Sequence, residues 1–347
     1  MNTLLGKTLS ELQVIAQEAG MQPFAGKQLA HWLYVQRVTD IDAMTNLPKK
    51  GREYLQAHYA IGRHEPIAHA RSQDGTCKYL FDVSHGTEKQ AYIETVYLPE
   101  EDRATLCVST QAGCRMGCRF CMTGTLGFQQ HLTAADILNQ IFTIDALHDH
   151  SLTNIVYMGE GEPLDNIEEV LRSIELLTAP YGAAWSPHRI TVSTVGYLPQ
   201  LQRFLDGCDC HLAISLHNPF PVERQQMMPA ERAYPIEEVL AVLRNYDFAH
   251  QRRLSFEYIC FGAQNDTPRY ARALVHLLHG LPCRINLIRF HASDKSKPMF
   301  APSDEEQMIR LRDYLTQHGI TTTIRRSRGE DILAACGMLV NALQKKQ

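Results

Sequence analysis

Three cysteines, Cys114, Cys118 and Cys121, lie close together in a C-x3-C-x2-C pattern. Thiolates at this spacing can bind one metal centre from a single loop, and they are soft ligands that suit iron–sulfur clusters and zinc. Three ligands are one short of a closed tetrahedral site, so a catalytic centre of this kind keeps one position open for a substrate or cofactor. The spacing alone also permits a zinc site that Cys107 or a histidine completes.

Polar groups at the ends of expected strands could face the same site. Gly161 and Glu162 follow one such strand. Glycine lets the backbone approach a ligand closely, and a carboxylate at a strand end can pair with a ligand ammonium, although a tight turn with a solvated carboxylate gives the same pattern. Hydroxyl and imidazole groups end two further strands at Ser193, Ser215 and His217. Each side chain could simply form a hydrogen bond with nearby backbone groups, but together they place polar groups on one rim of the expected sheet.

An alternation of strands and helices after about residue 104 must position these groups. The expected strands cover residues 104–109, 154–157, 189–193, 211–215, 253–259, 284–289 and 321–325. The expected helices cover residues 133–147, 167–177, 198–205, 236–248, 267–278 and 304–318. This alternation predicts a parallel α/β sheet that forms a complete or partial barrel, with its chemistry at the carboxyl ends of the strands. The cysteine loop directly follows the first of these strands.

The residues before the barrel have a different pattern. Apolar residues at helical spacing begin at Leu9, and further helices fit residues 26–38 and 49–59. Two β-rich segments then follow, at residues 79–83 and 90–98. We therefore divide the chain into a helical domain (1–60), a β-hairpin extension (61–103) and the barrel with its C-terminal segment (104–347). A last helix is expected over residues 332–343.

Composition narrows the class of protein. The chain has 347 residues, of which 44% are hydrophobic and 21% charged, with a net charge of −4 and ten cysteines. The net charge argues against a cationic, histone-like binder but permits local basic patches. The N-terminus has no apolar leader, and no stretch approaches the roughly 18 apolar residues that span a bilayer. We expect a cytoplasmic protein with no membrane association, in which structural disulfides are rare.

The cysteine pattern after the first barrel strand, with Phe120 before the third cysteine, resembles the radical S-adenosylmethionine (SAM) superfamily. The resemblance implies a partial (β/α)6-type barrel in which Cys114, Cys118 and Cys121 hold one 4Fe-4S cluster. It implies that SAM binds the open iron and that one electron cleaves SAM to a 5′-deoxyadenosyl radical. The cofactor contacts that it implies are Gly161, Glu162, Ser193, Ser215, Leu216, His217 and His291.

A narrower resemblance covers nearly the whole chain. The matching motifs are residues 103–109, 114–128, 158–163, 212–217, 285–288 and 328–337. They are similar to the RlmN/Cfr family of radical SAM RNA methyltransferases, and the run Ala334-Ala335-Cys336-Gly337 is highly specific for it. One position departs from the family, which often has Pro-Trp-Asn-Pro after residues 285–288. Here His291 stands at the Asn position, where it can still donate a hydrogen bond, and Lys295 and Lys297 follow.

The resemblance assigns roles to two more cysteines and a carboxylate. Carbon 2 of adenine is not nucleophilic, whereas a thiolate accepts a methyl group from SAM readily. The family first methylates the cysteine that corresponds to Cys336, and a second SAM then yields the radical that joins this methyl group to the adenine. Cys107 corresponds to the cysteine that attacks Cys336, releases the product and leaves a transient disulfide. Glu94 corresponds to the proton acceptor. Without the resemblance, both cysteines would be assigned to the core and Glu94 to the surface.

The resemblance also implies partners. Family members modify an adenosine in the peptidyl-transferase region of 23S rRNA, and some modify the adenosine beside the tRNA anticodon. A one-electron reductant such as flavodoxin or ferredoxin is implied, and the helical domain is a candidate RNA-recognition element. Basic clusters that could contact phosphates are residues 49–52, 252–253 and 325–328.

Three functions therefore stay open at this point. We favour methylation of adenine carbon 2, because it is the housekeeping reaction of the family. Methylation of carbon 8 of the same rRNA adenosine, as in Cfr, is the alternative within the family. A non-catalytic RNA-binding module with a structural zinc is the alternative of another class.

Overall fold

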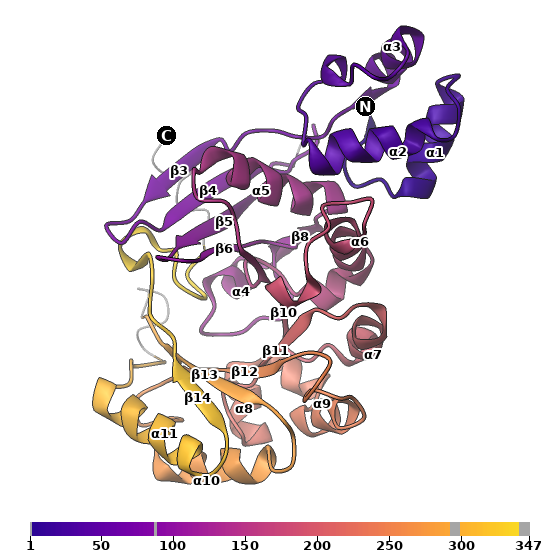
Figure 1. Cartoon of the computed structure of the whole chain (residues 1–347). Coiled ribbons are helices and arrows are strands. Elements are labelled where there is room, and N and C mark those ends of the chain that lie inside the picture. Colours follow the sequence, from indigo (N-terminus) through magenta and orange to yellow (C-terminus); the bar gives the residue numbers. More distant parts are fainter. Residues whose placement is uncertain (1, 87–88, 292–298, 340–347) are drawn as a thin grey trace.

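A computed structural model describes residues 2–86, 89–291 and 299–339 (Figure 1). One ten-stranded sheet in the order β14-β13-β12-β11-β10-β9-β6-β5-β4-β3 organises the chain. Its parallel strands are β6 (Ala104–Cys107), β9 (Asn154–Tyr157), β10 (Ile190–Thr194), β11 (His211–Ser215), β12 (Leu254–Cys260), β13 (Arg284–Arg289) and β14 (Thr321–Ile324). All seven predicted barrel strands are thus confirmed, with ends that shift by no more than two residues.

Helices cover the outside of this sheet, as Figure 1 shows. They are α5 (Ala134–Leu147), α6 (Ile167–Thr178), α7 (Leu198–Gly207), α9 (Ile236–Leu243), α10 (Pro268–Leu277) and α11 (Glu305–Gln317). Every residue of strand β12 is buried, which is typical of a covered parallel sheet, whereas β10 and β13 alternate apolar and polar residues. The sheet stays open, since β14 and β3 form its two edges. The predicted partial α/β barrel is therefore confirmed.

The β-rich extension belongs to the same sheet as the barrel. It contributes β3 (Ala68–Arg71), β4 (Cys77–Asp82) and β5 (Tyr92–Pro99), which pair antiparallel with one another. Strand β5 then pairs antiparallel with β6, so that Val96 lies opposite Cys107. This register brings the strand of Glu94 beside the strand of Cys107.

The N-terminal helices pack against the barrel through α5 and α6. They are α1 (Leu9–Glu18), α2 (Ala25–Ala30), which continues as a π-helical turn (His31–Val35), and α3 (Lys49–His58). Thr8 and Glu11 form a capping box that starts α1. Glu11 also pairs with Arg172 of α6 at 2.7 Å, and Arg37 pairs with Asp145 of α5.

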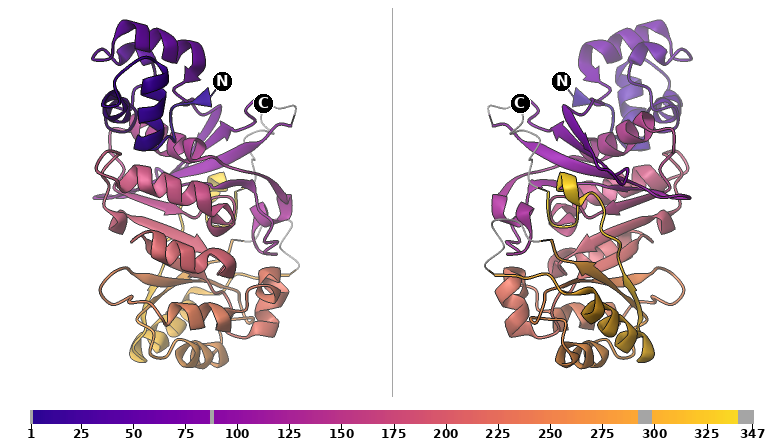
Figure 2. Two further views of the ribbon diagram at one scale, coloured as in Figure 1. Left: turned by 90° about the vertical axis from the view of Figure 1, so that its right-hand side faces the viewer. Right: turned by 90° about the vertical axis from the view of Figure 1, so that its left-hand side faces the viewer.

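The residues after β14 form a segment, 325–339, that we call the C-terminal strap. It runs back past the barrel to the β extension (Figure 2). Its only regular element among the described residues is the 3-10 turn Glu330–Ile332. The helix predicted over 332–343 is wrong for residues 333–339, because Leu333 and Gly337 adopt positive φ angles of 55° and 79° that interrupt a helix. The rest of that predicted helix lies outside the described residues.

The described part of the chain contains no helix that is both long and apolar enough to cross a membrane.

Candidate active site

The cysteine loop is fixed by backbone contacts at both ends. It lies between β7 (Gln111–Gly113) and α4 (Met122–Leu126). Gly113 has a φ of 71°, and a Cβ atom there would stand 1.9 Å from the carbonyl oxygen of Gly127, so only glycine fits. The Cys114 N–H donates to that same carbonyl at 3.1 Å, and the Cys121 N–H donates to the Cys118 carbonyl at 3.1 Å. The loop therefore holds its three thiols in a defined arrangement.

The surroundings of the three thiols suit an iron–sulfur cluster. They pack beside an apolar group that includes Met116 and Phe120. Burial raises the pKa of Cys114 to about 12 and that of Cys118 well above its usual range, and the neighbouring thiols add to both effects. No three Cys, His, Asp or Glu side chains among the described residues converge on a single ion. Because a four-iron cluster offers a separate iron to each thiolate, the three cysteines fit a cluster better than a zinc ion.

A cavity of about 150 Å³, which we call the cofactor cavity, adjoins these thiols. Its lining brings together residues from the ends of β9, β10 and β11. The predicted site residues among them are Cys114, Cys118, Cys121, Gly161, Glu162, Ser193, Ser215 and His217. Leu216 does not line the cavity: it is buried, and its backbone N–H donates to the Glu257 carbonyl at 3.0 Å.

Glu162 is the carboxylate best placed to receive a cationic group in the cofactor cavity. It is buried, and its two oxygens accept the backbone N–H groups of Leu164 and Val195 at 3.0 and 2.9 Å. Burial raises its pKa to about 7, which these hydrogen bonds oppose. Gly161 has a φ of 96°, and a Cβ there would stand 2.5 Å from Gln111. A side chain at 161 would therefore displace the loop that presents Glu162.

His217 lies on the other side of the cofactor cavity as a neutral ring. Its Nδ1 accepts the Ile259 N–H at 3.0 Å, which leaves Nε2 as the donor. Burial lowers its pKa to about 3. The ring packs edge-on against Phe120, with centroids 4.9 Å apart. His217 can therefore donate one hydrogen bond without adding charge to the cavity.

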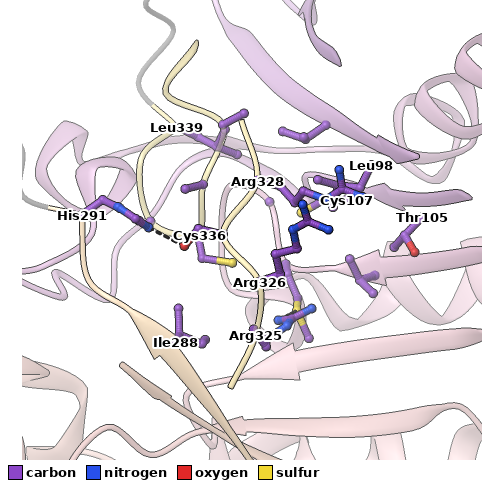
Figure 3. A pocket seen from close by; sticks show the side chains of 18 of the residues that line it. Leu98, Thr105, Cys107, Ile288, His291, Arg325, Arg326, Arg328, Cys336 and Leu339 are labelled. Carbon is purple, nitrogen blue, oxygen red and sulfur yellow. Dashed lines mark hydrogen bonds between the residues drawn. The ribbon is translucent and has the colours of Figure 1, made fainter. Parts of the chain in front are cut away.

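A second, larger cavity of about 330 Å³ contains both cysteines that the family resemblance singled out (Figure 3). We call it the thiol cavity. Cys107 enters it from the end of β6 and Cys336 from the strap, and both are free thiols. Burial raises the pKa of Cys107 to about 12, and the nearby Cys336 adds to this while Arg325 opposes it. Cys336 also lines the cofactor cavity, as does Cys121 of the cysteine loop, so the two cavities meet at these two residues.

Arg325 is a site residue that sequence reasoning assigned only to phosphate contact. It is the one charged side chain among the described residues that lines both cavities. Its Nη1 donates to Glu257 at 3.3 Å, and Asn286 donates to the other oxygen of that carboxylate at 2.7 Å. The guanidinium is thus anchored between the cofactor cavity and the two thiols. Neither Arg325 nor Glu257 carried a motif that marked it for this place.

His291 lies in the thiol cavity and does not line the cofactor cavity. Its Nε2 is 2.7 Å from the Ser327 hydroxyl, a contact that Figure 3 draws, and its Nδ1 is 3.4 Å from Glu330. The ring therefore contacts the strap. Lys295 and Lys297, which follow in the sequence, lie outside the described residues.

Glu94 is completely buried and lines neither cavity. Its carboxylate pairs with Lys78 at 3.0 Å, and its backbone N–H donates to Glu160 at 2.9 Å. Burial raises the pKa of Glu160 to about 8, and its other oxygen accepts the Gly113 N–H at 3.3 Å. Glu160 thus connects the strand of Glu94 to the start of the cysteine loop. Apart from the two glutamates just before Pro163, no sequence motif marks Glu160 for this link.

The basic clusters occupy different parts of the molecule. Arg326 is exposed and lines the thiol cavity. Arg328 instead donates to the backbone carbonyls of Asp74 and Pro99 and so fastens the strap. Residues 252–253 precede β12, at the end of the sheet opposite the two cavities. The expectation of a phosphate contact there finds no support in the site.

Comparisons with known proteins agree with this arrangement. Residues 108–277 match the radical SAM superfamily, and residues 2–61 match the ribosomal RNA large subunit methyltransferase N-terminal domain. A probable dual-specificity RNA methyltransferase RlmN of Bacteroides fragilis is 55% identical over 343 residues, which cover 99% of this chain and 97% of that protein. The dual-specificity RNA methyltransferase RlmN of Syntrophotalea carbinolica is 40% identical over 337 residues, covering 97% and 89%.

A solved structure extends the likeness to three dimensions. A radical SAM methyltransferase from Sphaerobacter thermophilus matches with a TM-score of 0.88 at 37% identity, covering 98% of this chain and 99% of that chain. The match includes the helical domain, the extension and the barrel. The chain therefore belongs to the RlmN family of radical SAM RNA methyltransferases.

Proposed function

We propose that the chain methylates carbon 2 of an adenosine in 23S rRNA and of an adenosine beside the tRNA anticodon. The observation that carries the proposal is the position of Cys336, which lines both the cofactor cavity and the cavity that holds Cys107. A methyl carrier has to meet its donor on one side and its acceptor on the other. The names of the relatives, which specify dual-specificity RNA methyltransferases, support two RNA substrates.

The cofactors would occupy the cofactor cavity. Held by Cys114, Cys118 and Cys121, a 4Fe-4S cluster with SAM supplies a 5′-deoxyadenosyl radical, for which a flavodoxin- or ferredoxin-type protein provides the electron. Gly161 and Glu162 would bind the methionyl amine, since Glu162 presents a buried carboxylate to an ammonium. Ser193, Ser215 and His217 line the remaining wall and would orient the rest of the molecule.

Cys336 would accept the methyl group from a first SAM. Its thiol loses a proton, a sulfur–carbon bond forms, and the sulfonium–methyl bond of SAM breaks to release S-adenosylhomocysteine. The strap exposes this thiol, so no rearrangement of the core is required. A second SAM per turnover would provide the 5′-deoxyadenosyl radical that removes one hydrogen atom from this methyl group, and the resulting carbon radical would add to adenine carbon 2. The adduct would then lose one electron, which the cluster can take back, and the proton of carbon 2. Glu94 would remove the proton of that carbon.

Cys107 would release the product. Its thiolate attacks the sulfur of Cys336 and forms a disulfide, while the sulfur–carbon bond to the RNA breaks and the carbon keeps the electron pair and takes a proton. An external dithiol has to reduce the disulfide before the next turnover. The two thiols share the thiol cavity, which supports this pairing. Arg325 lines the same cavity, and its positive charge would stabilise the thiolate form of either cysteine.

One experiment separates the candidate functions. The protein is purified without oxygen, its iron and zinc are measured, and RNA treated with SAM and a reductant is digested to nucleosides for mass spectrometry. We expect about four irons per chain and 2-methyladenosine in both rRNA and tRNA. Mainly 8-methyladenosine would favour the Cfr-like alternative, and a colourless zinc protein without methylation would favour the non-catalytic module.

A further inference from the structure

Lys78 links the expected proton acceptor to the strap that carries Cys336. It lies on β4 and is completely buried, although lysine is rarely found so unless it is paired. Its Nζ is 3.0 Å from Glu94 Oε1 and donates to the backbone carbonyl of Leu333 at 3.2 Å. Leu333 stands three residues before Cys336. One ammonium group therefore contacts both the carboxylate and the strap.

Glu94 faces the same side of the sheet as the thiol cavity. Side chains alternate along a strand, so Glu94 shares its face with Val96 and Leu98, which both line that cavity. In the register of β4 and β5, Lys78 lies opposite Val96. The strap covers this face, where Ala334 and Leu339 pack on Val96. The strap therefore lies over the face of the sheet that carries Glu94.

The strap is fastened on both sides of Leu333, whose own conformation is unfavourable. Asp331 accepts the Ser72 hydroxyl at 2.6 Å on the extension. The Gly337 carbonyl accepts the Met122 N–H at 2.8 Å on the cluster loop. Between these points Leu333 has a φ of 55°, a strained value for a branched residue. The hydrogen bond from Lys78 meets the chain at this strained residue.

We propose that Lys78 is a positioning residue that ties Glu94 to the backbone of the strap, so that the base reaches the thiol cavity only when the strap moves at Leu333. The proposal rests on the proposed function, because it takes Glu94 as the proton acceptor and Cys336 as the carrier. Before the RNA is joined to Cys336, the ion pair keeps the base behind the strap. Once the adduct draws Cys336 toward the RNA, the Lys78 contact to Leu333 is released and Glu94 can take the proton of carbon 2.

The central test is Lys78→Met in the full, cluster-loaded enzyme. Loss of the ammonium removes both the ion pair with Glu94 and the hydrogen bond to Leu333, so the carboxylate is no longer held in position relative to the strap. We expect S-methyl-Cys336 to form as in the parent, a covalent protein–RNA adduct to accumulate on denaturing gels, and turnover to fall roughly a hundredfold or more. Lys78→Arg, which keeps the charge, is expected to restore adduct release in part.

Hydrogen exchange of the backbone amides measures how firmly the strap is held, which an activity assay does not report. We expect amides of residues 330–339 to exchange roughly five- to tenfold faster in Lys78→Met, because a hydrogen bond to the strap is lost. Glu94→Gln retains Lys78 and its bond to Leu333, so its strap is expected to stay protected. The double variant Lys78→Met/Glu94→Gln removes both charges of the ion pair together and is the safer one to fold. Its strap is expected to exchange as fast as that of Lys78→Met.

The outcomes separate this inference from the proposed function. Parental turnover without adduct in Lys78→Met, or equal strap exchange in Glu94→Gln and the double variant, would overturn the role of Lys78. Absence of S-methyl-Cys336 in the parent would overturn the proposed function instead, and the exchange comparison would still test the link. Arg310→Met, on the exposed side of α11, is the matched control and is expected to match the parent in every readout.

Discussion

The two thiols of the proposed reaction have opposite surroundings. Cys336 is exposed on the strap, as a methyl acceptor that must meet two large molecules has to be. Cys107 is held at the end of β6, where burial disfavours its thiolate and Arg325 opposes that effect. A resolving thiol in this setting stays protonated until the adduct forms. These positions are consistent with the roles proposed for the two cysteines, Cys336 as carrier and Cys107 as resolving thiol.

Replacement of each thiol is expected to stop the reaction at a different point. Cys107→Ala is expected to form S-methyl-Cys336 and then stall as a protein–RNA crosslink, which a denaturing gel and peptide mass spectrometry detect. Cys336→Ala is expected to keep the iron content of the parent but to lose methyl transfer to RNA. Parental turnover by Cys107→Ala would contradict the resolving role, and methylated adenosine from Cys336→Ala would contradict the carrier role.

The pH dependence of product release follows from the pKa of Cys107. Burial raises this pKa to about 12, so only a small fraction of the thiol is ionised at neutral pH. Between pH 7 and pH 9 that fraction rises about tenfold for each pH unit. We expect release of the RNA from a preformed adduct, followed by rapid quench, to accelerate with the same slope. Arg325→Gln is expected to slow release at every pH in this range, and a pH-independent rate would contradict the assignment.

At the scale of elements, a buried ion pair supports the strand ends that form the cofactor cavity. Arg224 is completely buried on α8 (Pro221–Met227) and pairs with Glu231. Its guanidinium also donates to the carbonyls of Val195, Ser215 and Leu216. These carbonyls lie at or just after the carboxyl ends of β10 and β11, close in sequence to Ser193 and His217. The Arg224–Glu231 ion pair therefore holds in place the strand ends that form one wall of the cofactor cavity.

Glu231→Gln is expected to destabilise the fold by about 3–5 kcal/mol, because it leaves the Arg224 charge buried without a partner. Urea denaturation of the cluster-free chain measures the effect. Glu168→Gln removes one partner of the exposed pair with Arg203 and serves as the control, for which no change in midpoint is expected. A loss in Glu231→Gln no larger than in the control would show that the buried pair is dispensable.

The spacing of apolar residues predicted the alternating strands and helices of the barrel. It did not predict segments whose conformation depends on contacts with distant parts of the chain. Strands and helices of the barrel alternate in apolar runs, so their number and order were predictable from the chain. The strap was not predictable in this way. Its backbone is held by hydrogen bonds of Asp331 and Gly337 to residues that are distant in the sequence, and not by bonds within a helix or strand. The sequence suggested the hairpin of the extension but contained no signal that it would join the barrel sheet.

The site was predictable where a motif marked it. The three cluster cysteines and Glu162 follow from spacing and strand ends, whereas the pairing of Cys107 with Cys336 required the family resemblance. Lys78 had one usable signal, since it is a lysine inside the apolar strand Cys77–Asp82. Such a residue is rarely buried without a partner, but the sequence could not identify the partner as Glu94.

At the scale of the whole molecule, a net charge of −4 is compatible with a local group of arginines. The thiol cavity has several arginines at its margin, of which Arg328 and Arg289 are committed to contacts within the protein. Arg326 makes no hydrogen bond or ion pair with the described residues and is exposed at the cavity. It is therefore the cation with most freedom to meet an RNA phosphate.

Arg326→Gln is expected to weaken RNA binding alike for rRNA and tRNA fragments, because a phosphate contact carries no sequence information. The slope of log affinity against log salt concentration is expected to become shallower by about 1. Fluorescence anisotropy at several salt concentrations measures it, with Arg310→Gln as the control. An unchanged slope would show that Arg326 does not contact phosphate.

The hydrogen bond from Met122 to Gly337 joins the residue after the last cluster cysteine to the residue after the methyl carrier. A second bond joins the Thr123 hydroxyl to the Leu339 carbonyl at 3.1 Å. Because these bonds place the strap over the cysteine loop, a cluster is expected to be inserted before the strap docks. In iron-starved cells, protease is expected to nick the chain first in the strap.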